Sequence, residues 1–159
     1  MSVARIQSSD ELRDLYRELI LDHSRNPRHF GKLADATHTA EGINPLCGDK
    51  LRLYLQLDTS GVIQDASFEG SGCAISVASA SLLTDIVIGK SRDSALDYFA
   101  AITSHLTAVT ADNPAPIDLE QIRALDGVRE FPARIKCATL AWHALHSAIQ
   151  QQARPVTTE

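Results

Sequence analysis

The chain has 159 residues, of which 44% are hydrophobic, 22% are charged and 5% are aromatic. This length and balance exclude a disordered or fibrous protein and predict a single domain over residues 1–159, with a core over about 9–151. The formal net charge of −5 offers no basic field to a nucleic acid backbone. Because the sequence shows no apolar run of about 18 residues and no secretory signal, we expect a cytoplasmic protein with no nucleic acid or membrane partner.

The first half of the chain predicts one helix and then a small sheet. Apolar residues at three- and four-residue spacing predict an amphipathic helix over 11–24. Residues 51–57 place four leucines at a period of two, which is typical of a strand with one face on a core. Residues 62–69 follow a turn and predict its antiparallel partner, and 37–43 is a candidate third strand.

The second half changes to a helical period. A proline-rich break is expected at 112–116, and the tail 153–159 is expected to fray. Strands followed by helices predict an α+β fold, in which helices pack on one face of a three-stranded antiparallel sheet. The predicted helices cover residues 74–88, 93–109, 118–125 and 132 to about 151.

Three cysteines, Cys47, Cys73 and Cys137, cannot all pair with one another, and a cytosolic compartment keeps thiols reduced. They are therefore buried residues, metal ligands or nucleophiles. Asp49 follows Cys47 by two residues, and residues two apart in an extended chain project to the same side. The two side chains can then reach one ion. The alternative is a turn with a buried thiol and a surface acid.

The other two cysteines lie at the edges of predicted helices. Cys73 follows Gly72 at a strand-to-helix junction, where free backbone N–H groups and the helix dipole favour a thiolate. The alternative is only a tight turn. Cys137 lies about a turn into the last helix beside Arg134 and Lys136, whose charges favour a thiolate. The alternative is a cysteine of the core.

Together, the three cysteines and Asp49 supply four ligands of the types that suit tetrahedral zinc. Their combined negative charge exceeds the charge of a zinc ion, and Arg134 and Lys136 partly balance it. A carboxylate among thiolates indicates one replaceable position, so that one thiolate can leave the metal and act as a nucleophile.

Four segments of the sequence also carry a family resemblance, and together they cover most of residues 12–148. On these segments the chain resembles a SufU-type member of the IscU/NifU iron–sulfur cluster assembly family. The resemblance implies a SufE/NifU-like (IscU-like) fold and one metal or cluster site made by Cys47, Asp49, Cys73 and Cys137. The segments are LYRELILDHSRNPRHFG, NPLCGD, FEGSGCAISVASASLLTDIVIGK and FPARIKCATLAWHAL.

The resemblance implies two alternative functions. In the SufU branch, a zinc-dependent sulfurtransferase takes persulfide sulfur from a pyridoxal-phosphate-dependent cysteine desulfurase (SufS-like) and passes it to a downstream iron–sulfur scaffold. By this resemblance Cys47 is the persulfide acceptor, freed when a residue of the desulfurase displaces it from zinc. In the IscU branch, the same residues assemble and transfer a [2Fe-2S] cluster.

Two departures from the IscU pattern favour the SufU branch. Lys136 stands where IscU proteins usually have a histidine, and a protonated amine is a poor ligand. The separation of Cys73 from Cys137 is also longer than in the IscU type, with an insertion around 112–116.

Other readings stay open beside these two branches. Arg134 is a candidate for supporting the site, with a solvated helix residue as the alternative. His143 and His146 are interpreted as surface or packing residues and not as ligands. A purely structural zinc site in an interaction module remains the non-catalytic alternative.

Overall fold

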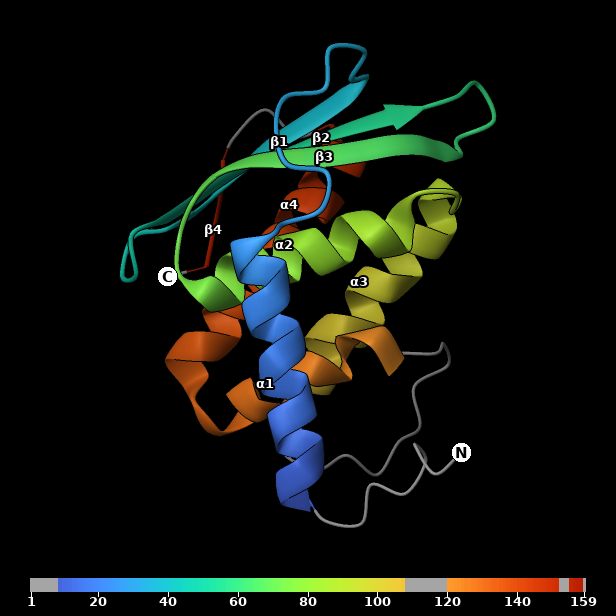
Figure 1. The fold of residues 1–159 in the computed structure, drawn as a ribbon. Helices are drawn as coiled ribbons and strands as arrows, with labels where there is room; N and C mark the ends of the chain where they lie inside the picture. Colours follow the sequence, from blue (N-terminus) through green and yellow to red (C-terminus); the bar gives the residue numbers. More distant parts are fainter. Residues whose placement is uncertain (1–8, 108–119, 152–154, 159) are drawn as a thin grey trace, which may run out of the picture.

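The structure is a computed structural model that describes residues 9–107, 120–151 and 155–158. Figure 1 shows a sheet with a layer of helices beneath it, an α+β architecture as predicted. In chain order the elements are α1 (Ser9–Arg25), β1 (His38–Asn44), β2 (Asp49–Leu57), β3 (Ile63–Ser71), α2 (Ala74–Val87), α3 (Arg92–Thr107), the 3-10 helix η2 (Glu120–Glu130), α4 (Pro132–Ile149) and β4 (Val156–Thr157).

The predicted strands form an antiparallel meander. β1 pairs with β2 up to Asn44 opposite Asp49, and β2 pairs with β3 from Lys50 opposite Ser71. Alternation along β2 decides which face is buried, because successive side chains of a strand point to opposite sides. The four leucines of one parity belong to the hydrophobic core under the sheet: Leu51, Leu53, Leu55 and Leu57.

The prediction of a three-stranded antiparallel sheet is wrong in one respect, because the sheet has a fourth strand. This strand lies in the tail that was expected to fray. Val156–Thr157 form β4, which pairs parallel with β1, so the described sheet is mixed with the order β3-β2-β1-β4. The backbone N–H of Thr158 also donates to the carbonyl of Ile43 at 3.2 Å. A strand of two residues has no alternation for a periodicity argument to detect. Residues 153–154 and 159 lie outside the described residues.

The four longer predicted helices are present as α1, α2, α3 and α4, with ends within a few residues of those expected. The predicted helix over 118–125 is described only from residue 120, and there it is a 3-10 helix that continues to Glu130. The proline-rich break at 112–116 lies outside the described residues, as do 108–109 of the third helix. None of the described helices is both long and apolar enough to cross a membrane.

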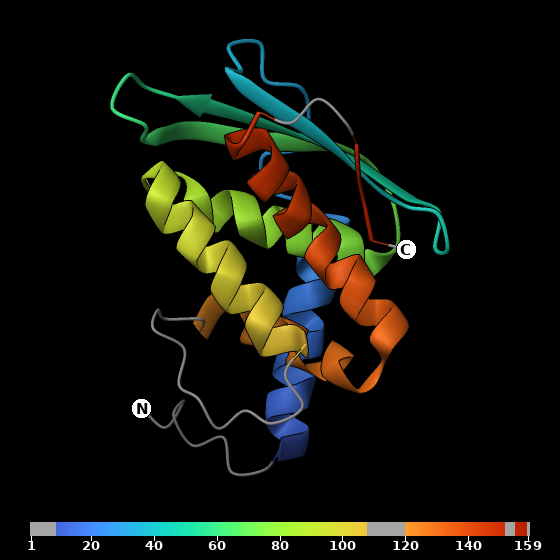
Figure 2. The ribbon, with the colours of Figure 1, turned by 180° about the vertical axis from the view of Figure 1, so that it is seen from behind.

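The helices lie on one face of the sheet, as both ribbon views show (Figures 1 and 2). α4 packs directly against β1 and β2, and α2 packs between α1, α4 and β3. Trp142 and Leu140 of α4 and Phe68 of β3 are among the most deeply buried side chains. This packing brings the β1–β2 hairpin and the beginnings of α2 and α4 to one end of the molecule, on the left in Figure 1.

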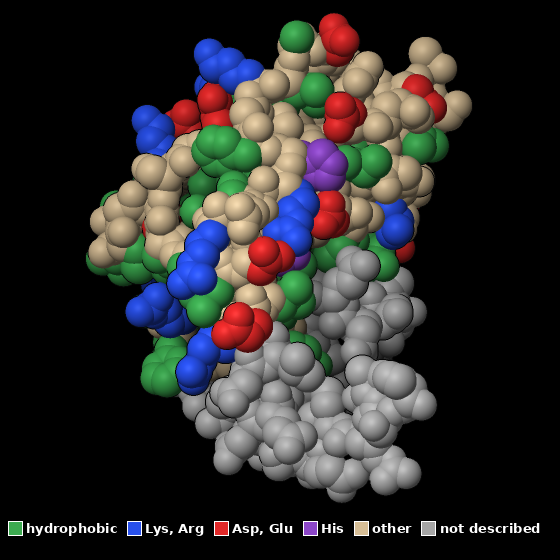
Figure 3. All heavy atoms as spheres, viewed as in Figure 1, with side chains coloured by type: hydrophobic (Ala, Val, Ile, Leu, Met, Phe, Trp, Pro, Cys, Tyr) green, Lys and Arg blue, Asp and Glu red, His purple; other side chains and the backbone are tan. Residues whose placement is uncertain are grey.

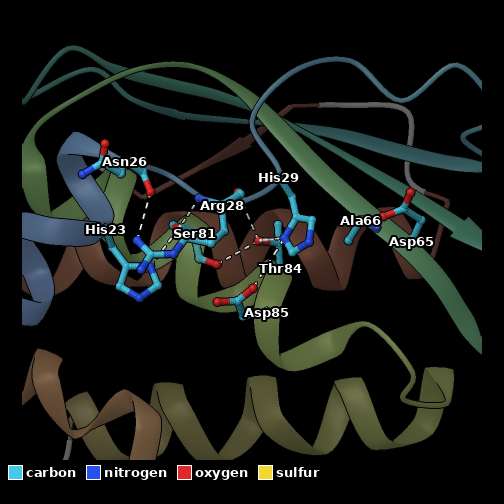
Figure 4. Close-up of polar contacts among 9 residues, drawn as sticks. All are labelled: His23, Asn26, Arg28, His29, Asp65, Ala66, Ser81, Thr84 and Asp85. Atoms are coloured by element: carbon cyan, nitrogen blue, oxygen red, sulfur yellow. Dashed lines mark hydrogen bonds and ion pairs between the residues drawn. The ribbon is translucent and has the colours of Figure 1, made fainter.

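A polar network fastens the end of α1 to the middle of α2 (Figure 4). His23 Nδ1 lies 2.7 Å from Ser81 Oγ, and the same oxygen accepts the backbone N–H of Arg28 at 2.8 Å. Ser81 Oγ therefore joins the end of α1 and the loop after it to one side chain of α2. His29 Nδ1 lies 3.1 Å from Thr84 Oγ1 one turn further along α2.

Candidate metal centre

Cys47 lies in the hairpin loop that joins β1 to β2. Asn44 and Asp49 are the last paired residues of the two strands, so residues 45–48 form the loop. Gly48 has a φ of 74°, in the left-handed region that favours glycine. Cys47 is exposed and Asp49 is buried. The hairpin therefore holds its thiol at the surface and its carboxylate inside.

Cys73 is the N-cap residue of α2. Its backbone is extended, with φ −70° and ψ 167°, and its Sγ accepts the backbone N–H of Ser76 at 3.5 Å. A sulfur in this position replaces the oxygen that usually caps a helix, and it accepts one of the free N–H groups of the first turn. Cys73 is half-buried.

Cys137 lies in the second turn of α4 and is only 1% exposed. Its Sγ is 3.6 Å from the carbonyl of Ala133 and 3.8 Å from the side-chain amide nitrogen of Asn44. Pro132 occupies the first turn, where its fixed φ suits the start of a helix and its missing N–H is not needed. The helix start thus directs this thiol inward, toward the end of β1.

The structure brings all four predicted side chains to one place. The Sγ atoms of Cys47 and Cys137 are 3.4 Å apart, and one ligand atom from each of Cys47, Asp49 and Cys137 lies within 4.8 Å of the others. The Sγ of Cys73 is outside that compact group but lies 3.9 Å from Asp49 Oδ2. The cluster joins the β1–β2 hairpin, the start of α2 and the start of α4.

Both oxygens of the Asp49 carboxylate are already held by neighbours on α2. Oδ1 accepts the backbone N–H of Cys73 at 2.8 Å, and Oδ2 accepts the hydroxyl of Ser76 at 3.0 Å. Ser76 Oγ also lies 3.3 Å from the carbonyl of Cys137. Sequence reasoning missed Ser76 and Asn44 as neighbours of the cluster. Ser76 is one of several serines in a small-residue helix, and nothing in the sequence distinguishes it.

Two glycines allow the chain to pass closely beside Asp49. Gly70 has a φ of 131°, and a Cβ there would lie 2.1 Å from the backbone oxygen of Lys50. A Cβ at Gly72 would lie 2.7 Å from Asp49 Oδ1. Side chains at either position would push β3 or the cap of α2 away from the carboxylate. Gly72 therefore allows the chain before Cys73 to pass directly beside the carboxylate of Asp49.

The chemistry of the donor set suits a soft or borderline divalent cation. Burial raises the pKa of the Cys137 thiol, and hydrogen bonds with Cys47 and Cys73 raise it further. Several thiolates and a carboxylate at this spacing repel one another, so their common ionised form needs a positive charge among them. Three sulfurs and one carboxylate oxygen match the ligand types and number of a tetrahedral zinc site.

Comparison with known proteins identifies the family of the chain. The model of the NifU-like N terminal domain matches residues 15–157. The chain belongs to this family. The match spans all four residues of the cluster and the β1–β2 hairpin, α2 and α4 that carry them.

Relatives of this NifU-like domain carry two kinds of name. The zinc-dependent sulfurtransferase SufU of Bacillus subtilis is 44% identical over 87% of this chain and 91% of its own length. The iron–sulfur cluster assembly scaffold protein IscU of Streptococcus pyogenes is also 44% identical, over 90% of this chain and 87% of its own. A crystal structure from Fervidobacterium islandicum, titled a putative SUF-system scaffold, superposes with a TM-score of 0.73 at 32% identity, covering 83% of this chain and 94% of that one.

The remaining candidate residues of this NifU-like domain lie around the cluster without joining it. Arg134 is exposed, and its side chain makes no ion pair or hydrogen bond among the described residues. Lys136 is half-buried and lines an open groove of about 950 Å³ beside α4. His143 and His146 pack on the ring of Phe99, with ring centroids 5.2 and 4.8 Å away.

Proposed function

We propose that this protein accepts persulfide sulfur on Cys47 from a cysteine desulfurase and passes it into iron–sulfur cluster assembly, as a zinc-dependent sulfurtransferase. The observation that carries the proposal is the graded exposure of one thiol cluster. Cys47 is exposed, Cys73 is half-buried and Cys137 is buried. An incoming sulfur donor reaches Cys47 first, because the other two sulfurs lie behind it.

The residues present fit zinc, with Cys47, Asp49, Cys73 and Cys137 as its ligands. Bound zinc supplies a positive charge that keeps its thiolate ligands deprotonated at neutral pH. Asp49 is aimed at the cluster by Cys73 and Ser76 through both of its oxygens. The exposed loop 45–48 allows Cys47 to turn toward a partner, whereas Cys137 is fixed within a helix.

The transfer step is an exchange at sulfur. The Cys47 thiolate attacks the terminal sulfur of a cysteine persulfide on the donor, and the donor's S–S bond breaks as the new S–S bond forms. The donor cysteine leaves as a thiolate, and Cys47 becomes the persulfide. The step has no net oxidation or reduction, and its rate follows the thiolate fraction and accessibility of Cys47.

The names of the relatives support sulfur transfer and also a second candidate. The relative from Bacillus subtilis is named a zinc-dependent sulfurtransferase, and the equally identical relative from Streptococcus pyogenes is named a scaffold. The second candidate is therefore assembly of a [2Fe-2S] cluster on the same four residues. Lys136, adjacent to Cys137, favours the first candidate, because its ammonium group offers no lone pair to iron.

The deciding experiment measures persulfide on the protein purified without oxygen, together with its zinc, iron and acid-labile sulfide. With a cysteine desulfurase and cysteine, we expect persulfide on the wild type, about one zinc per chain and no sulfide. Cys47→Ala should lose the persulfide, and the desulfurase without this protein is the control for background transfer. Equal labelling of Cys47→Ala and wild type would contradict the acceptor role, and iron with sulfide in comparable amounts would support the scaffold.

A further inference from the structure

The surface around Cys47 carries two of the three large hydrophobic side chains that the described structure leaves exposed. Leu46, next to Cys47 in the hairpin loop, is 73% exposed, and Phe131 at the N-cap of α4 is 57% exposed. Phe131 precedes Cys137 by six residues, which is about 9 Å along a helix axis. Leu46 and Phe131 therefore flank the thiol cluster on its hairpin side and on its α4 side.

Neither exposed side chain packs against the hydrophobic core of the protein. Leu46 and Phe131 are absent from the hydrophobic core and from the residues packed against it. Exposed leucine and phenylalanine side chains are unfavourable in water, and burying them at an interface lowers the free energy. Their position beside a reactive thiol points to a surface that is covered when the thiol reacts.

Three basic residues follow the same two side chains along the chain. The first turn of α4 has no acidic residue, and Arg134 and Lys136 follow Phe131 on this helix. Lys50, which follows the hairpin loop, is also exposed. Figure 3 shows blue Lys and Arg side chains beside hydrophobic ones at the lower left, with red Asp and Glu side chains next to them, on the side on which Figure 1 places the starts of α2 and α4. Arg134, Lys136 and Lys50 thus lie close in the chain to the two exposed hydrophobic side chains, in a protein with a net charge of −5.

We infer that Leu46, Phe131 and Arg134 form the docking surface for the protein that donates sulfur to Cys47, and that this donor presents an apolar recess framed by acidic side chains. The inference rests on the proposed function. Sulfur exchange requires the donor sulfur within about 3.5 Å of Cys47 Sγ. A donor chain that comes so close must cover Leu46, the immediate neighbour of Cys47. Gly48 on the other side leaves the path to the thiol open.

The hydrophobic and the basic side chains of this surface contribute to docking in different ways. Leu46 and Phe131 supply the apolar area that keeps the complex together, and interface cores are depleted of charge. Arg134 has no partner to lose among the described residues, so its charge is available to an acidic donor surface. Opposite charges at an interface rim raise the association rate and make it sensitive to salt.

The test measures stimulation of a cysteine desulfurase from the same organism against the concentration of this protein. Leu46→Glu and Phe131→Ala should each raise the concentration for half-maximal stimulation at least about tenfold, the effect of an interface hot spot. Arg134→Glu should raise it at low salt and reduce its salt dependence, and Arg134→Lys should restore both. The matched controls are Phe30→Ala, an exposed phenylalanine beside Phe68 of β3, and Arg92→Glu beside Gly61 at the opposite hairpin.

A small donor separates this inference from the proposed function. Acceptance of sulfur by Cys47 from inorganic polysulfide needs no docking surface, so Phe131→Ala should take it up at the wild-type rate with wild-type zinc content. Unchanged half-maximal concentrations in all three surface variants would overturn the docking surface, and so would an equal rise in both controls. If the wild type takes no sulfur from either donor, the proposed function itself fails.

Discussion

The carboxylate of Asp49 is oriented before any cation arrives. It is 1% exposed, and its oxygens accept hydrogen bonds from the backbone of Cys73 and the hydroxyl of Ser76. An ionised carboxylate accepts about four hydrogen bonds or ligand contacts, so two positions remain for a metal. Hydrogen bonds of this kind fix the orientation of a ligand. Ser76 is therefore the residue whose side chain fixes the Asp49 carboxylate from α2, beside the backbone of Cys73.

Replacing Ser76 should weaken zinc binding without unfolding the protein. Ser76→Ala removes one of the two donors to Asp49, and loss of such a support typically costs about 10- to 100-fold in metal affinity. Competition with a chromophoric chelator measures the change. Ser79→Ala is the matched control, because Ser79 lies about one turn along α2 and bonds the carbonyl of Ala138 and the indole N–H of Trp142, without a bond to Asp49. Equal zinc affinity in Ser76→Ala and Ser79→Ala would contradict this role.

The α1–α2 contact depends on a neutral histidine. Burial lowers the pKa of His23 most, the charge of Arg28 lowers it further, and Asp85 and Asp22 oppose the shift. His23 is also held in place by the contact of 2.7 Å between its Nδ1 and Ser81 Oγ. The folded state therefore binds this proton less readily than the unfolded chain, so the unfolded chain carries more protons below its ordinary pKa of 6.5.

Stability should fall as the solution is acidified, with His23 responsible for part of the slope. The contribution of neutral His23 is fully present above about pH 6.5, its unfolded value, and is lost as the pH falls toward its lower folded pKa. Chemical denaturation at pH 7 and pH 5, in chelator so that metal release does not contribute, measures the free energy of unfolding. His23→Gln should give a shallower slope than the wild type, and adding His143→Gln, whose pKa burial also lowers, should flatten it further. An unchanged slope in His23→Gln would refute the assignment.

Among the helices and strands, those with a periodic pattern of apolar residues could be predicted from the sequence. The leucines of β2 and the apolar stripes of the helices specify their buried faces, and these elements are present. β4 has two residues, and its pairing depends on where the chain leaves α4, which no local pattern records. The candidate site was likewise predictable only where residue type and local position indicate a role. Residue type and element edges indicated the cysteines and Asp49, whereas Ser76 acquires its role only from the packing of α2 on the hairpin.

The tail strand should contribute modestly to stability and nothing to metal binding. A chain ending at Arg154 loses β4 and the bond from the Thr158 backbone to Ile43. We expect a loss of about 1 kcal/mol, or a Tm lower by about 2 to 4 °C, with unchanged zinc content. Thr158→Val is the control, because the buried Thr158 Oγ1 has no hydrogen-bond partner in the described structure. A Tm loss in Thr158→Val as large as in the truncated chain would place the effect in the side chain.

Across the whole molecule, the hydrophobic core is separate from the cluster of three cysteines and Asp49. The core runs between the sheet and the helices through residues such as Trp142, Leu83 and Leu55, and the cluster occupies the edge where the hairpin meets α2 and α4. Hydrophobic burial on this scale folds domains of this length without a metal. Zinc would then add stability by binding the folded state, without being required for the fold.

Removal of zinc should therefore lower the Tm and leave the fold in place. In the metal-free protein, burial keeps the Cys137 thiol neutral by raising its pKa, so the empty cluster does not carry the full charge of its ligands. The far-UV circular dichroism spectrum at 25 °C in excess chelator should match that of the zinc form. The Tm of the zinc form should rise with the free zinc concentration, because zinc binds only the folded state. Asp49→Asn, which weakens the site, should show a smaller zinc-dependent rise in Tm. A purely structural zinc site predicts the opposite, because metal binding would then be folding: helical signal would disappear on chelation and return with zinc.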